Sequence, residues 1–171
     1  MAIDAFVKPF LRLALFQGLK PLELTEIVRR ADRIVYKAGD VIIQEDTPGD
    51  AAVIIISGEA VRLNGTGDGT PAEPVPEGAI VGELAMLVET VHSATVVAKG
   101  TVRALRITRD NLHELMLEDP QLAAHFADKI TARLQRLASE LKSIDQALAD
   151  IAQFKPGPRA VTHHEAASAL H

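Results

Sequence analysis

The chain has 171 residues, 47% hydrophobic and 24% charged, so it can bury the core of one domain and is not expected to be disordered. It has no cysteine, which excludes disulfides, thiolate metal sites and a thiol nucleophile. Its net charge of −5 argues against the clustered basic face that binding to nucleic acid requires. Because we find neither a secretory leader nor an apolar run of membrane-spanning length, we expect a cytoplasmic protein without a membrane partner.

Residues 1–33 are predicted to be helical. Phe6, Phe10 and Leu13 recur at helical spacing near the start. A second helix is expected to begin at Pro21, because proline is favoured at the first helical position, and Glu23 suits the first turn.

Residues 34–110 are predicted to form a β domain. Short runs rich in β-branched residues are separated by glycine-containing turns, a pattern typical of a sandwich, roll or barrel. The expected strands are residues 34–36, 41–43, 52–56, 61–63, 95–98 and 102–107. Residues 64–76, rich in Gly and Pro, are expected to be a hairpin tip that only connects strands.

Residues 110–154 are predicted to be helical, with one helix ending near Pro120 and a longer one after it. Apolar residues in the longer helix are spaced 4, 3, 4, 3, 4 and 3 apart; they are Ile130, Leu134, Leu137, Leu141, Ile144, Leu148 and Ile151. This narrow heptad seam predicts a two-stranded homodimer, the alternative being a helix that packs only on its own β domain. Residues 155–171, which open with two prolines, are expected to be a disordered tail.

Residues 78–98 contain the most informative motif in the chain. Gly82 allows the backbone to approach a ligand closely, Glu83 supplies a carboxylate, and residues 84–87 can form one helical turn. Backbone N–H groups at the start of such a turn suit a phosphate. The segment therefore predicts an anion-binding turn presented by the β domain.

Together these residues resemble the cyclic nucleotide-binding domain family, as found in catabolite activator protein. The resemblance is carried by residues 82–85 (Gly-Glu-Leu-Ala), by the turns at residues 38–40, 48–50 and 57–59, and by the opening at residues 15–24. It implies an α+β fold, an antiparallel, jelly-roll-like β-roll with N-terminal helices and a long C-terminal helix. It also implies a regulatory domain that needs no cofactor, takes cAMP or cGMP as its possible ligand, and signals to an unknown downstream protein by repositioning the long helix.

The resemblance identifies residues 78–98 as the family's phosphate-binding cassette, called the cassette below, and assigns ligand-binding roles within it. Glu83 would accept a hydrogen bond from the ribose 2′-hydroxyl, and Ser93 could donate its hydroxyl to the phosphate. The backbone N–H groups of Gly82, Glu83, Leu84 and Ala85 would face the phosphate. His92 stands where the family has an arginine that binds the cyclic phosphate.

An arginine would form a permanent, bidentate charge pair with the phosphate, whereas an unperturbed histidine is mostly neutral at pH 7. Loss of one partner of a buried charge pair costs about 2–5 kcal/mol. Three outcomes are open. His92 binds the phosphate as imidazolium; Arg103 or Arg106 on the following strand compensates; or the pocket is degenerate, and the chain is an interaction or scaffold protein that binds neither cAMP nor cGMP.

Two other classes of function find no support in the sequence. The His-x-His pair of a cupin metal centre is absent, as are the Gly-x-Ser-x-Gly, Walker and His-Glu-x-x-His motifs, so we expect neither catalysis nor a metal site. Transcription regulators of the resembled family carry a helix-turn-helix domain after the long helix. Only 17 residues follow Phe154, too few for that domain, so we expect either a chain without an output domain or a fragment of a longer one.

Overall fold

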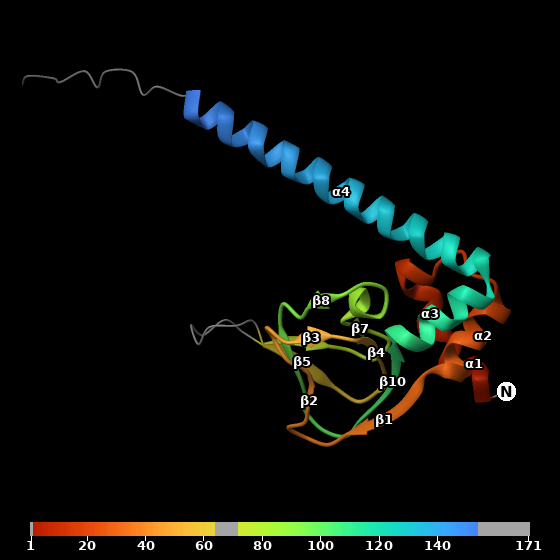
Figure 1. Cartoon of the computed structure of the whole chain (residues 1–171). Helices are drawn as coiled ribbons and strands as arrows, with labels where there is room; N and C mark the ends of the chain where they lie inside the picture. Colours follow the sequence, from red (N-terminus) through yellow and green to blue (C-terminus); the bar gives the residue numbers. More distant parts are fainter. Residues whose placement is uncertain (1, 64–71, 154–171) are drawn as a thin grey trace, which may run out of the picture. The chain divides into compact units, whose positions relative to one another are not determined.

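The structure is a computed structural model that describes residues 2–63 and 72–153 (Figure 1). The chain divides into two compact units, Met1–Lys129 and Ile130–His171. The expected tail at residues 155–171 lies outside the described residues, as does most of the expected hairpin tip at residues 64–76.

The described residues of the first unit, 2–63 and 72–129, form three short helices, two 3-10 turns, ten strands and the start of a fourth helix. The helices and turns are α1 (Ala2–Arg12), η1 (Ala14–Phe16), α2 (Pro21–Arg30), η2 (Glu83–Met86), α3 (Arg109–Glu118) and α4 (Pro120–Gln153). The strands are β1 (Asp32–Tyr36), β2 (Val41–Ile43), β3 (Pro48–Gly49), β4 (Ala51–Ser57), β5 (Ala60–Leu63), β6 (Glu73–Val75), β7 (Ile80–Val81), β8 (Thr90–Val91), β9 (Thr95–Ala98) and β10 (Val102–Thr108).

Two four-stranded antiparallel sheets form the β-roll. Their strand orders are β1-β10-β4-β7 and β2-β9-β5-β6, and β3 pairs with β8 as a separate two-stranded ribbon. Apolar side chains from both sheets fill the roll; they are Ile42, Val53, Ile55, Ala60, Val75, Val81, Val96, Ala98, Val102 and Ala104. The architecture confirms the expected α+β fold with an antiparallel roll.

A second apolar core lies between the first sheet and helices α1, α2 and α3, which gather at one end of the roll (Figure 1). Side chains alternate between the two faces of a strand, so Ile54 and Leu105 point away from the roll interior, and both are fully buried. Phe16 joins this core edge-to-face with Phe10 and Phe126, at centroid distances of 4.9 and 5.9 Å. The start of α4 thereby belongs to the first unit.

Local sequence signals account for the helix boundaries. The carboxylate of Glu23 accepts a hydrogen bond from the Lys20 N–H at the start of α2. Thr108 caps α3, because its hydroxyl oxygen accepts from the Asn111 N–H at 3.2 Å. Pro120 opens α4 where the sequence predicted it.

The part of α4 in the second unit presents the seam as exposed side chains. Leu134, Leu137, Leu141, Ile144, Leu148 and Ile151 are 48–69% exposed, and Ile130 is half-buried. No helix in the described part of the chain is long and apolar enough to cross a membrane.

Candidate functional site

The expected helical turn of the cassette is present as η2. Gly82 precedes it in the left-handed conformation, with φ 67° and ψ 29°, which favours glycine over residues with a side chain. The N–H of Ala85 donates to the carbonyl oxygen of Gly82 at 2.9 Å, and the N–H of Leu87 donates to that of Leu84 at the same distance. The start of the turn, from Gly82 to Leu84, is the end that suits an anion.

The imidazole of His92 packs on the backbone of two glycines. A Cβ atom added to Gly82 would lie 3.0 Å from its Cε1, and one added to Gly49 would lie 2.8 Å from the same atom. The main chain of His92 is held by residues 46–47, since its carbonyl oxygen accepts from the Asp46 N–H at 2.9 Å and its N–H donates to Thr47 at 3.0 Å. The residue at the position of the family arginine is thus half-buried beside Gly82, the residue that precedes the turn.

The other cassette residues differ in exposure. Ala85 is fully buried, and its Cβ would lie 2.6 Å from a Cβ added to Gly49, so the three segments that contain Gly49, Ala85 and His92 meet closely. Glu83 and Leu84 are half-buried, and Ser93 is exposed. Gly49, which the sequence indicated only as part of a turn, therefore belongs to the candidate site.

The two arginines considered as compensating cations lie on opposite faces of β10. Arg103 is exposed, and its partner in the β1 register, Val35, is 61% exposed, so Arg103 lies on the outer face. Arg106 pairs in register with Val53 of the roll core and therefore faces the interior. Its guanidinium is bound by two carboxylates, Asp50 at 2.7 Å and Asp32 at 3.4 Å.

Tyr36 faces the same interior, where it packs against the roll core. Burial raises the pKa of its phenol; the Arg106 charge acts in the opposite direction, and the Asp40 charge raises the pKa further. The interior near Arg106 therefore combines a neutral phenol with a cation that is already paired with two aspartates.

Arg109, the first residue of α3, was not identified from the sequence as a site residue, yet it holds the end of the cassette turn. Its Nη1 lies 3.1, 3.3 and 3.2 Å from the carbonyl oxygens of Gly49, Ala85 and Val88, respectively. Its backbone N–H donates to the carbonyl oxygen of Asp50 at 2.7 Å. No sequence signal marks this role, because an arginine near a helix N-terminus has no expected partner among residues 20–60 positions away.

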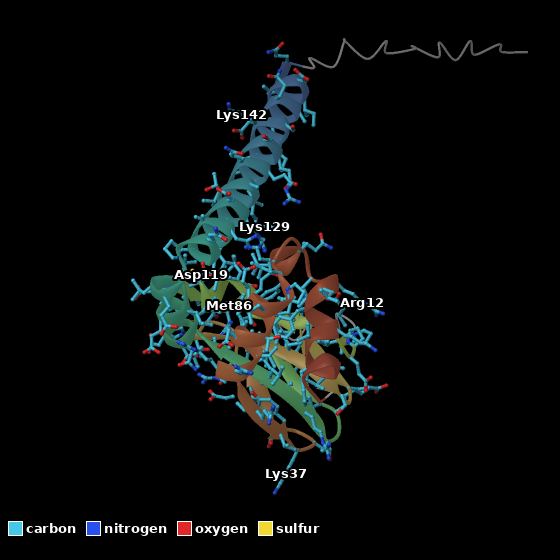
Figure 2. All side chains as sticks on the ribbon, turned by 90° about the vertical axis from the view of Figure 1, so that its right-hand side faces the viewer. Arg12, Lys37, Met86, Asp119, Lys129 and Lys142 are labelled. Atoms are coloured by element: carbon cyan, nitrogen blue, oxygen red, sulfur yellow. The ribbon has the colours of Figure 1, made fainter. Side chains whose placement is uncertain are left out.

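His113 provides a second link between α3 and the cassette. Its Nε2 lies 2.9 Å from the carbonyl oxygen of Leu87, which can only accept, so this nitrogen carries the hydrogen. Met86, the fully buried last residue of η2, is labelled beside α3 in Figure 2. Helix α3 is also tied to α2, because the Asn111 side chain donates to the carbonyl oxygen of Arg30 at 2.9 Å. Helix α3 thus bridges the cassette and the N-terminal helices.

A cavity of about 350 Å³ adjoins the start of α3, lined by Asp32, Asp50, Thr108, Arg109, Asp110 and Asn111. Three of its six lining residues are aspartates, so its charge does not favour an anion. Within residues 2–63 and 72–153 no group of three or more His, Asp or Glu side chains is placed to hold a metal ion.

Residues 33–119 match the family model described as cyclic nucleotide-binding domain, and the chain belongs to this family. The chain is similar to the cAMP-dependent protein kinase regulatory subunit of Aspergillus fumigatus, with 38% identity over 128 residues that cover 74% of this chain and 30% of that one. It is also similar to a cyclic nucleotide-gated potassium channel of Mesorhizobium japonicum, with 33% identity over 125 residues that cover 73% and 34%. The chain thus spans about a third of the length of these curated relatives.

Solved structures agree with this assignment. The N-terminal domain of a transcriptional regulator from Streptomyces coelicolor has a TM-score of 0.71 at 21% identity, covering 78% of this chain and 94% of that one, which shows the shared fold. A cyclic nucleotide-binding-like protein from Brucella abortus has a TM-score of 0.60 at 27% identity, covering 64% and 96%. The family and the fold that the sequence predicted are therefore confirmed.

Proposed function

We propose that this chain is a non-catalytic regulatory domain that binds a cyclic nucleotide, cAMP or cGMP, at residues 82–93. The observation that carries the proposal is the cassette turn itself, in which a left-handed Gly82 opens η2 and the His92 imidazole lies against that glycine. Glu83 is half-buried at the first position of the turn, where it suits a ribose hydroxyl. The relatives named as cAMP-dependent regulatory subunits support cAMP as the ligand.

The arrangement favours His92 over either arginine as the cation for the phosphate. His92 lies beside the start of the turn, whereas Arg103 lies on the outer face and Arg106 is already bound by two carboxylates. An imidazolium donates hydrogen bonds from both ring nitrogens, but only while it is protonated. We therefore propose that the site binds the cyclic phosphate more weakly than a site with the family arginine would, and that its affinity depends on pH.

Isothermal titration of the whole chain with cAMP and with cGMP, at pH 6 and at pH 8, tests this proposal. We expect tighter binding at pH 6, and the difference should disappear in His92→Gln. His92→Arg should bind about 30-fold more tightly or better, from the roughly 2–5 kcal/mol of a buried charge pair. No heat at millimolar nucleotide in either the native chain or His92→Arg would contradict the proposal.

We further propose that ligand binding is transmitted from the cassette to α3 and then along α4. The support is that Arg109 and His113 hold the carbonyl oxygens at the end of the cassette turn. The exposed seam of α4 is proposed to form a homodimer, whose geometry would change when α3 moves. The output is proposed to be a downstream protein, and we propose a cytoplasmic location.

A second candidate function is an interaction or scaffold protein with a degenerate pocket. The observation that favours it is the close packing of the His92 ring on Gly49 and Gly82, which fills space at the start of the turn. The interior cation Arg106 also faces two carboxylates, which leaves that cluster with a net negative charge. In this case His92→Arg would not restore nucleotide binding, while self-association through α4 would remain.

A further inference from the structure

The seam of α4 places leucine and isoleucine in an unusual order. In a heptad a step of three residues leads from position a to position d, and a step of four leads from d to the next a. Position a is therefore occupied by Leu134, Leu141 and Leu148, and position d by Ile130, Leu137, Ile144 and Ile151. Parallel two-stranded coiled coils favour β-branched residues at a and leucine at d, and the reverse order shifts parallel helices to three or four strands. The seam is poorly suited to a parallel pair.

The residues beside the seam disfavour parallel neighbours in a bundle of any size. In a parallel bundle a g residue lies beside the e residue five positions later on the next helix. This would place Glu140 beside Asp145 of every neighbour, and both side chains are exposed. Like charges at such positions are destabilising. The remaining g–e pairs add no attraction, because each contains an alanine, namely Ala138, Ala147 or Ala152.

We infer that α4 pairs with the α4 of a second copy in the antiparallel orientation. This inference rests on the self-association in the proposed function and adds its direction. When the pair is centred between residues 142 and 143, the six seam residues from Leu134 to Ile151 form layers that each join an a residue to a d residue, and Ile130 lies beyond these layers. Leu134 then faces Ile151, Leu137 faces Leu148, and Leu141 faces Ile144. Because a and d share each layer, the reversed order of leucine and isoleucine no longer opposes a two-stranded coil.

The flanking residues fit this arrangement as well. In an antiparallel pair g positions meet g positions and e positions meet e positions. Glu140 then lies nearest Ala147 of the second copy, and Asp145 nearest Ala138, so neither acid has an acid as its nearest neighbour across the seam. The small alanine side chains also allow the two backbones to approach. The two chains enter the paired segment from opposite ends.

Disulfide trapping reads this orientation directly, because the chain has no cysteine of its own. Leu137→Cys and Leu148→Cys are prepared separately, mixed under reducing conditions so that subunits exchange, and then oxidised. In the antiparallel pair residue 137 lies about 16 Å along the axis from its own copy, from a rise of 1.5 Å per residue. A disulfide requires Cα atoms within about 7 Å of each other. We therefore expect a cross-link in the mixture and in neither variant alone.

Light scattering on the whole chain under reducing conditions measures the mass of the assembly. Ser139→Cys, which places a cysteine on the side of the helix away from the seam, is the control for disulfides that form by random collision. We expect a mass of twice 18.4 kDa. A disulfide in Leu137→Cys alone overturns the inference, because it requires parallel helices. The absence of any disulfide in a protein of twice the chain mass also overturns it. A monomeric mass for the native chain instead refutes the proposed self-association itself.

Discussion

Arg109 joins the end of the cassette turn to the start of α3, and we expect its loss to destabilise the first unit. Its Nη1 lies 3.1–3.3 Å from three carbonyl oxygens, those of Gly49, Ala85 and Val88. Arg109→Met keeps an unbranched apolar stem and removes every donor of the guanidinium. Three segments that are distant in the sequence would then lose their common donor.

The magnitude follows from how many of these hydrogen bonds one nitrogen can make. Nη1 carries two hydrogens, so at most two of the three contacts are at full strength at one time. A hydrogen bond with a charged partner contributes about 1.5–3 kcal/mol, and water can replace part of this at Val88, which is 42% exposed. We therefore expect Arg109→Met to lower the free energy of unfolding by about 2–4 kcal/mol.

Urea unfolding followed by circular dichroism measures this loss. Arg62→Met is the matched control, because Arg62 makes an exposed ion pair with Glu73 at 3.4 Å, which should contribute less than about 1 kcal/mol. Arg109→Lys should recover only part of the stability, since a single ammonium cannot reproduce the spread of the guanidinium. If Arg109→Met were no less stable than Arg62→Met, the role of Arg109 in holding the cassette would be wrong.

Three further predictions follow from the geometry. Gly58→Ala should lower the free energy of unfolding by about 2 kcal/mol or more, because Gly58 has a φ of +96° and an added Cβ would collide with the Thr101 carbonyl oxygen. Gly39→Ala is the control: Gly39 has a φ of +89° but open space around it, so the loss in the same urea titration should be smaller. Leu141→Asp places a carboxylate in the seam, so light scattering should show a monomer; an unchanged mass would refute the paired helix. Burial raises the pKa of Tyr36, so the unfolded state ionises first and stability, complete below the ordinary value of 10.0, should fall as the pH rises above it. Tyr36 is the only tyrosine, so its absorbance titration reports the shift directly, and Tyr36→Phe should weaken the fall.

Features that depend on near neighbours in the chain were predictable from the sequence. The start of α4 at Pro120 appears where local signals predicted it. The turn after Gly82 was also expected, because its conformation depends on that glycine and the residues directly after it. Residues 48–49, expected as part of a turn, instead form β3 and pair with β8, about 40 residues further along the chain. A strand of two residues has too short a pattern to be predicted from the sequence.

The sequence by itself determined the β-roll, the heptad seam and the replacement of the family arginine by His92, since each depends on residue types at short, countable spacings. Only the tertiary structure decided which charged groups are already engaged. The sequence left Arg106 as a possible phosphate partner, but in the structure its guanidinium lies between Asp32 and Asp50. The role of Arg109 depends on three carbonyl oxygens, distant in the sequence, that lie within 3.3 Å of its Nη1. The physical reason is that hydrogen bonds and ion pairs act over about 3–4 Å in space, whatever the separation in the chain.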